Sequence, residues 1–362
     1  MRQAALPPDP IRACLGIDRA ALRALTAGLH RHKAWVYWAD LSASLAAGYG
    51  AFALLPVHRP LSPVAAVLYA VAVLAIYRAM VFTHEIAHMP PHRLPGFRLV
   101  WNLACGIPLL IPSYFYDQHI VHHAKRTYGT SDDGEYLPYA RLPASRLALL
   151  FAASPLALPA LLLRFLLLPP IMLLWPAARR FVLTRASSLV IDPDHRRPSP
   201  AGPWQRSWTM QEAACFAWCL AIVLALKAGL IAPARLAAAA AVLSGVFAIN
   251  ALRTVLAHCY AGQRTVMEFQ DQVLDSNDFP YLMAVLWAPV GLRFHAVHHL
   301  LPSLPYHALP ALHRRLMATL PADSPYRDCQ HASLFAGIRS VVRLRRSLAP
   351  CDPARAAQPS AA

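Results

Sequence analysis

The sequence is poor in charged residues, which make up only 14% of its 362 positions. A typical globular chain holds about 25%. Hydrophobic residues account for 57% of the chain, and Lys33, Lys125 and Lys227 are its only lysines. The length would suit one large or two ordinary domains, but this composition argues against an ordinary soluble protein.

Paired cysteines and a signal peptide are also missing. No CxxC pattern occurs, and the odd number of scattered cysteines predicts free thiols, with neither a disulfide framework nor a zinc ribbon. They are Cys14, Cys105, Cys215, Cys219, Cys259, Cys329 and Cys351. Residues 1–33 form a basic leader without the apolar core of about 7–15 residues that a secretory signal needs. We therefore expect the first apolar segment to insert as an uncleaved span.

Acidic residues are too few to balance the arginines, and the net charge is +16. A strongly basic chain binds nucleic acid, anionic lipid headgroups or an acidic protein partner. The basic residues are spread over several loops rather than gathered in one stripe with interleaved aromatics, so we expect no nucleic acid. Lipid headgroups and an acidic protein remain as partners.

Long apolar runs predict an all-α protein that crosses the membrane several times. The runs at 35–56 and 61–82 have 22 residues each, slightly more than the ~20 that a helix needs to cross the bilayer. Runs at 213–230 and 235–256 form a second predicted hairpin. Two further apolar runs, 99–116 and 147–175, are interrupted by prolines. We expect the first to be re-entrant or interfacial and the second to lie at the membrane surface. The Ala/Pro-rich tail, 349–362, is expected to be disordered.

The distribution of basic residues predicts the topology. The turns at 57–60 and 231–235 hold one basic residue each, whereas the other connecting segments hold six to ten. Since basic loops stay in the cytoplasm, both turns should face outward and everything else inward. We expect an integral protein of the bacterial inner membrane, with its interfacial helices and polar segments forming a cytoplasmic cap.

Eight histidines stand in three clusters, each close to an apolar run. The clusters are box one (His84 and His88), box two (His119, His122 and His123) and box three (His295, His298 and His299). Histidines three or four residues apart share one face of a helix and can hold a metal together. His258 follows the second hairpin directly and is a ninth candidate. Nine imidazoles are too many for one tetrahedral zinc and fit two irons, each with an open position.

Two further motifs resemble those of the membrane fatty acid desaturase family. Residues 129–138 read GTSDDGEYLP, similar to the family's GTxxDPEYLP, and residues 298–305 read HHLLPSLP, similar to its HHLFPxxP. The resemblance covers about residues 35–320 and is closer to acyl-lipid members than to front-end members, because box three begins with His295 rather than Gln. His258 matches an extra ligand of stearoyl-CoA-type members, with Thr254 where those have Asn one turn earlier.

The resemblance implies a desaturase domain over residues 34–348 with a cytoplasmic, histidine-held di-iron cap. It implies O2-dependent desaturation of a lipid-linked or thioester acyl chain in a narrow apolar tunnel. A separate, ferredoxin-like donor would supply electrons, because no His-Pro-Gly-Gly segment of a fused cytochrome b5 occurs. Carboxylates that orient ligand histidines are sought among the nearby acids. With Thr254, the candidates are Glu85, Asp117, Asp132, Asp133, Glu135, Glu268 and Asp271. His92 is a possible reserve ligand, and Tyr281 and Trp287 are expected at the interface.

Three alternatives remain open. The same site in related enzymes hydroxylates or ketonates a lipid, because the outcome depends on small differences in substrate placement. His84-Glu85-Ile86-Ala87-His88 also matches the HExxH pattern of zinc proteases, with Glu85 as the general base. That hypothesis leaves boxes two and three unused. A metal or lipid carrier would need ionisable residues inside its spans, and only Asp40, Arg78 and Lys227 come near this.

Overall fold

Nearly all regular structure in the described chain is helical. The computed structural model describes residues 9–348, and within that range it contains helices and three isolated β-bridges but no strand. The all-α prediction is confirmed. The tail predicted to be disordered, 349–362, lies outside the described residues. The six cysteines inside the range are free thiols, as predicted.

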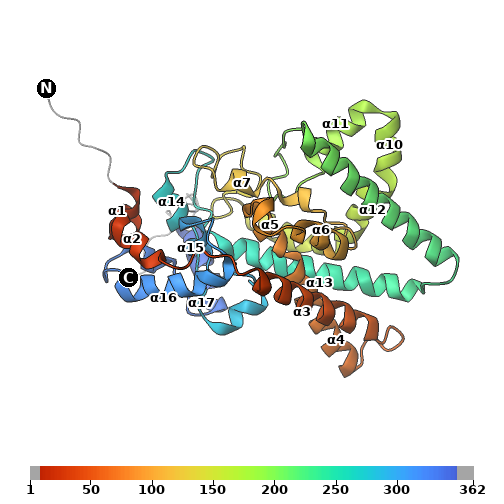
Figure 1. The fold of residues 1–362 in the computed structure, drawn as a ribbon, viewed down its shortest axis with the longest axis horizontal. Helices are drawn as coiled ribbons and strands as arrows, with labels where there is room; N and C mark the ends of the chain where they lie inside the picture. The colour runs from red at the N-terminus through yellow and green to blue at the C-terminus, as the bar shows by residue number, and fades with distance from the viewer. Residues whose placement is uncertain (1–8, 349–362) are drawn as a thin grey trace, which may run out of the picture.

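Two antiparallel hairpins form the elongated half of the molecule (Figure 1). The first pairs α3 (Ala34–Leu54) with α4 (Pro63–Met80), and the second pairs α12 (Pro203–Lys227) with α13 (Pro233–Ala257). Proline in the first turn starts α4, α12 and α13, where its missing N–H would have no helical partner. Ser62 caps α4 by accepting a hydrogen bond from the Ala65 N–H at 3.2 Å.

The first hairpin is held by close packing and by an ion pair. Arg78 of α4 makes two 2.6 Å contacts to the Asp40 carboxylate of α3, and the Tyr306 hydroxyl donates to the same group at 2.8 Å. A Cβ at Gly48 would lie 2.7 Å from the Ile76 side chain, so glycine allows the two helices to approach. The two charges that sequence reasoning placed near the span ends therefore neutralise each other.

Four described helical stretches are long and apolar enough to cross a membrane. They are Pro63–His88, Ala144–Leu174, Pro203–Lys227 and Pro233–Ala257. Three correspond to predicted spans. The fourth predicted span, 35–56, does form the helix α3 but is not among the four, since Asp40, two serines and two glycines lower its hydropathy. The side of the membrane on which each loop lies stays a prediction.

The expectation that 147–175 would be broken is corrected by this result, since the segment forms one helical stretch, but whether it crosses the bilayer or lies at its surface stays a prediction. The stretch runs through α8 (Ala144–Ala152), η4 (Ser154–Leu156), α9 (Ala157–Leu162), the π-helix η5 (Leu163–Leu167) and α10 (Leu168–Leu174). Pro155, Pro159, Pro169 and Pro170 lie in the first turns of these successive segments, and the helical stretch continues past each of them. The charge of Arg164 is balanced by Glu212 of α12 at 2.6 Å, both buried.

A polar cap is built from the ends of the chain and from the loops between spans. Short helices that carry or surround the boxes are α5 (Phe82–His88), α7 (His119–His122), α14 (Phe269–Leu274) and α15 (His295–Leu300). The other described elements outside the long helices and the basic leader are η1 (Pro91–Arg93), α6 (Phe97–Trp101), η2 (Asn102–Gly106), η3 (Ser113–Tyr116), α11 (Pro176–Arg185), η6 (Leu282–Leu286), η7 (Tyr306–Ala308), α16 (Leu309–Thr319), η8 (Pro325–Cys329) and α17 (Leu334–Leu348).

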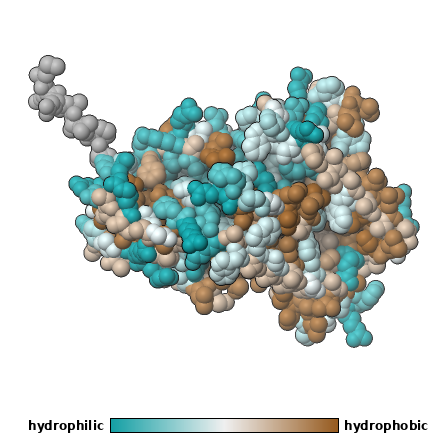
Figure 2. Space-filling model, viewed as in Figure 1, coloured by the Kyte–Doolittle hydropathy of each residue, from teal (hydrophilic) through white to brown (hydrophobic). Residues whose placement is uncertain are grey.

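The described part of the basic leader belongs to this cap. It forms α1 (Pro10–Leu15) and α2 (Arg19–Thr26), and Leu15 packs in one hydrophobic cluster with Leu312 and Tyr326. Figure 2 shows hydrophobic residues gathered over the hairpin half and hydrophilic ones over the cap end. Highly exposed apolar side chains such as Leu61, Leu174 and Leu230 lie on the hairpin half. This separation is expected of a membrane protein with a polar cap.

Candidate metal centre

The three boxes and His258 meet where the hairpins join the cap. His84 and His88 lie one turn apart on α5, which continues directly from α4 after Val81. His258 is the C-cap residue of α13, while boxes two and three occupy α7 and α15. Seven of the nine side chains are buried, and only His88 and His123 are partly exposed. All nine predicted ligands are brought together.

The histidines fall into two sets whose ring nitrogens lie within 4.8 Å of one another. The first set contains His84, His88, His119, His123 and His298. The second set contains His122, His258, His295 and His299. Sequence reasoning placed each HxxHH triad on one face, but the structure divides each triad. Its residues four apart serve one set and the remaining histidine serves the other.

The nitrogen spacing fits a metal in each set. Two imidazole nitrogens bound at right angles to one metal, each about 2.1 Å away, lie about 3 Å apart. In the first set, the Nε2 atom of His123 lies 3.1 Å from that of His119 and 3.0 Å from that of His298. In the second, the Nε2 atom of His258 lies 3.2 Å from that of His122 and 3.0 Å from that of His295.

Buried ring nitrogens without a partner point to the same conclusion. Among the described residues, both nitrogens of His84 and His299 and the Nε2 of His88 have no hydrogen-bond partner. A buried polar atom without a partner is rare and costly. Burial and neighbouring histidines hold the pKa of His119, His123 and His298 well below the usual value, so these rings are neutral at pH 7. Neutral imidazole is the form that binds metals.

Two carboxylates fix the orientation of box two. Glu135 contacts the Nδ1 of His119 at 2.9 Å, and Asp133 contacts the Nδ1 of His122 at 2.9 Å, so both rings direct Nε2 to their sets. Burial opposes the charged form of His122, but Asp133 outweighs it and raises the pKa of that ring. Burial likewise raises the pKa of Glu135 to about 7. Asp133 and Glu135 were both candidates from the sequence.

Other supporting residues were missed by sequence reasoning. The Nδ1 of His258 lies 3.0 Å from the Tyr128 hydroxyl and 3.1 Å from the Ser276 hydroxyl. Tyr128 in turn donates to Asp275 at 3.1 Å, and burial raises the pKa of Asp275 to about 7. The buried Asp278 accepts a hydrogen bond from the Ala296 N–H at 2.8 Å and so fixes the first turn of box three. These are single polar residues in loops, and no spacing marks them.

The remaining sequence candidates lie elsewhere. Asp117 pairs with Arg197 at 2.5 Å, and Glu268 pairs with Lys125 at 2.8 Å on the exposed surface. Asp132, Asp271 and His92 are exposed and belong to neither set. These residues do not orient the histidines.

Glu85 and Thr254 are buried beside the site without holding a ligand ring. Glu85 accepts hydrogen bonds from the Tyr37 hydroxyl at 2.7 Å and from the Tyr306 N–H at 3.3 Å. It lies 3.7 Å from the nearest nitrogen of His84, which is too far for a hydrogen bond. Thr254 lines the adjoining cavity, and only its backbone carbonyl accepts a bond, from Tyr260 at 2.9 Å.

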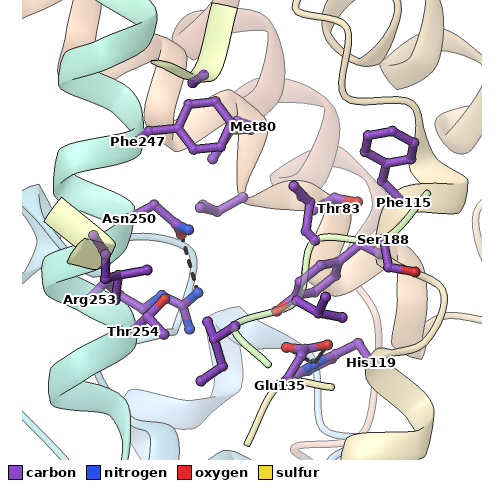
Figure 3. A pocket seen from close by; sticks show the side chains of 18 of the residues that line it. Met80, Thr83, Phe115, His119, Glu135, Ser188, Phe247, Asn250, Arg253 and Thr254 are labelled. Carbon is purple, nitrogen blue, oxygen red and sulfur yellow. Dashed lines mark hydrogen bonds and ion pairs between the residues drawn. The ribbon is translucent and has the colours of Figure 1, made fainter. Parts of the chain in front are cut away.

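A cavity of about 470 Å³ leads from between the helices to the histidines. This volume lies within the range of about 300–1,000 Å³ that is usual for small-molecule sites. Apolar side chains such as Met80 and Phe247 line the end away from the histidines (Figure 3), and Leu161 also lines the cavity. Its inner end is lined by histidines of both sets, namely His84, His119, His122, His258 and His295. Tyr281 and Trp287 do not line it, and the Trp287 N–H donates to the Tyr281 hydroxyl at 3.0 Å.

Comparison with known proteins identifies the family. The family model described as fatty acid desaturase matches residues 59–330. A ceramide hydroxylase of Caulobacter vibrioides (strain NA1000 / CB15N) is 37% identical over 333 residues, which cover 91% of this chain and 94% of that protein. No solved structure matches the chain. The zinc-protease hypothesis loses its basis, since His84 and His88 belong to a five-histidine set. The chain is an oxidoreductase and belongs to the fatty acid desaturase family.

Proposed function

We propose that this protein hydroxylates a ceramide-class lipid, using O2 at a di-iron centre held by the nine histidines. The observation that carries the proposal is the near full-length similarity to a ceramide hydroxylase. The sequence alone favoured desaturation and kept hydroxylation as its alternative. The proposal reverses that order, because family membership is common to both activities and the ceramide hydroxylase matches nearly the whole of both chains.

Two irons suit the donor set. The first set would hold one ion through five histidines and the second set the other through four. Iron of this kind supplies the activation of O2 that removal of an unactivated hydrogen requires and that no side chain can supply. With four or five imidazoles each, the two ions would remain accessible to a reactant.

The chain's own residues position the substrate and the ligands. The apolar walls of the cavity would bind the hydrocarbon part of the lipid and exclude water from the histidines. Glu135 and Asp133 keep the Nδ1–H of their histidines occupied, so each ring presents Nε2 inward. The wall formed by α8, η4 and α9 contributes Leu150, Leu156 and Leu161 to the cavity, and the lipid would enter along this wall.

The reaction requires an electron source. One C–H bond of the lipid is converted to C–OH by one oxygen atom of O2. The other oxygen atom takes up two electrons and two protons and leaves as water. A separate ferredoxin-like donor would deliver the electrons to the basic cap. Membrane placement follows the charge distribution, with the cap in the cytoplasm and the cavity opening at the level of the bilayer.

Lipid analysis of an expressing host tests the proposal. A bacterial host that makes ceramides would carry either the wild-type gene or the His298→Ala/His299→Ala double variant, which removes one histidine from each set. We expect ceramides heavier by one oxygen only in the wild-type host, and fragmentation would locate the new hydroxyl group.

The alternatives give different masses. Species lighter by two hydrogens would assign desaturation instead. Unchanged lipids together with iron in the purified protein would show that the donor or the lipid class is wrong. Unchanged lipids and no bound iron would contradict the di-iron site itself.

A further inference from the structure

The cavity wall formed by α13 carries a polar group close to the histidines. Along this helix the lining changes from Phe247 to Asn250, Arg253 and Thr254 before it reaches His258 (Figure 3). Most of the remaining wall is apolar. An arginine that faces a largely apolar cavity requires a reason, because burying an uncompensated charge is costly.

Arg253 has no carboxylate partner among the described residues. Its one hydrogen bond there runs from a terminal nitrogen to the Asn250 side-chain oxygen at 3.2 Å, and its Nε is buried without a partner. Three other buried or half-buried arginines are neutralised, since Arg78 pairs with Asp40, Arg164 with Glu212 and Arg197 with Asp117. Glu135 lines the same cavity, and its charge and that of Arg253 attract each other without a direct contact. The terminal N–H donors of Arg253 that do not bond to Asn250 are therefore available to a molecule in the cavity.

We propose that Arg253, with Asn250, binds an oxygen atom of the substrate's polar region and thereby sets which carbon is oxidised. The inference rests on the proposed function and adds a determinant of position to it. In a ceramide-class lipid, the matching oxygens are the amide carbonyl and the hydroxyl groups of the sphingoid base. Arg253 acts here as a positioning residue and does not ligate a metal.

The order of residues along α13 gives the direction of this positioning. Asn250 and Arg253 lie between Phe247 and His258 in the lining of the cavity. A polar group bound by Arg253 and Asn250 would place the polar end of the lipid beside the histidines, with the hydrocarbon tail against Phe247 and the apolar walls.

Binding and product analysis with purified protein test this role. Wild type, Arg253→Met, Arg253→Lys and the control Arg339→Met would be compared, since Arg339 is exposed on α17. The probes are a short-chain ceramide, N-octanoyl sphinganine, and octanoic acid in the same detergent. The readouts are the dissociation constant, the iron content and the position of the hydroxyl group in the product.

We expect Arg253→Met to bind the ceramide roughly 10- to 100-fold more weakly, as loss of hydrogen bonds to a charged group implies. Its iron content should be unchanged, and its products should be spread over several carbons. Arg253→Lys should recover part of the affinity, because it keeps the charge but loses the planar fork. Arg339→Met should match wild type in all three measurements.

Other outcomes overturn the inference in distinguishable ways. If wild type binds and hydroxylates the ceramide and Arg253→Met does so equally well at the same carbon, Arg253 has no positioning role. If only octanoic acid shows the dependence on Arg253, the cation serves a carboxylate rather than an amide or hydroxyl. If wild type binds no ceramide, the proposed substrate class is wrong and this inference falls with it.

Discussion

Changing Asp133 to asparagine should loosen one iron and leave the other in place. Asp133 contacts the Nδ1 of His122, which belongs to the second set, whereas Glu135 contacts the Nδ1 of His119 in the first set. The amide introduced by Asp133→Asn can still form a hydrogen bond but carries no charge to stabilise the ring as a donor. Loss of such a supporting group lowers metal affinity by about 10- to 100-fold. This corresponds to roughly 1.4–2.7 kcal/mol for the second set.

Iron retention under a chelator measures the effect. Purified protein would be titrated with a chelator while iron per protein is followed by elemental analysis. Wild type should hold two irons to high chelator concentration. Asp133→Asn should lose about one iron early, and Glu135→Gln should lose one iron early from the first set, so the double variant should lose both.

A neighbouring residue provides the control. Asp132 precedes Asp133 directly but is exposed and belongs to neither set, so Asp132→Asn should retain iron like wild type. Asp133 also accepts hydrogen bonds from the Gly129 and Glu135 N–H groups, at 3.2 and 3.0 Å. Circular dichroism would show whether the loop survives. Retention of both irons with wild-type affinity, or simultaneous loss of both in a folded Asp133→Asn protein, would refute the division into two sets.

Three further predictions concern the scaffold and the donor. Arg164→Met leaves Glu212 buried without its partner and should destabilise the protein by about 3–5 kcal/mol, whereas Arg164→Met/Glu212→Leu should recover most of that loss. Thermal unfolding in detergent compares the two variants with wild type. Equal melting temperatures for all three would show that the ion pair does not contribute to stability. Asp278→Ala removes the acceptor for the Ala296 N–H at the start of box three. It should lower the free energy of unfolding by about 1–3 kcal/mol and weaken iron retention in both sets. Unchanged iron retention would mean that packing alone holds box three in place. Turnover with an acidic ferredoxin-like donor should fall several-fold as the salt concentration is raised from about 0.05 to about 0.5 M, because salt screens the attraction of the donor to the basic cap. A turnover rate that is independent of salt concentration would exclude electrostatic docking of the donor.

The nine histidines could be predicted because their chemistry is local. Spacings of three and four residues place imidazoles on one face of a short helix, and each box lies close to an apolar run. His258 could be found because it directly follows a hairpin. The confirmed family membership rests on the same motifs. The division of each HxxHH triad between two sets could not be predicted, because it depends on how α5, α7 and α15 meet in space.

Long-range polar contacts were outside the reach of sequence reasoning. Tyr128 and Asp275 are 147 residues apart in the chain, and neither lies in a recognisable motif. Asp117 and Glu268 were reasonable candidates, but arginine and lysine partners compete for them. The segment 147–175 was wrongly expected to be broken because its prolines were counted without regard to position. In first turns they are compatible with a continuing helix, and Glu212, just outside the predicted span, compensates Arg164.

The sharing of boxes two and three between both sets gives the metals a mechanical role. An ion in the first set would tie α5 to α15 across more than two hundred residues of sequence, and an ion in the second would tie α7, the end of α13 and α15. Each ion thus acts as a cross-link that closes a very long loop, and such closure restricts the unfolded chain far more than the folded one. The ions that would support oxidation would therefore also stabilise the contact between the cap and the hairpins. Iron starvation should then shorten the lifetime of the protein as well as stop its activity.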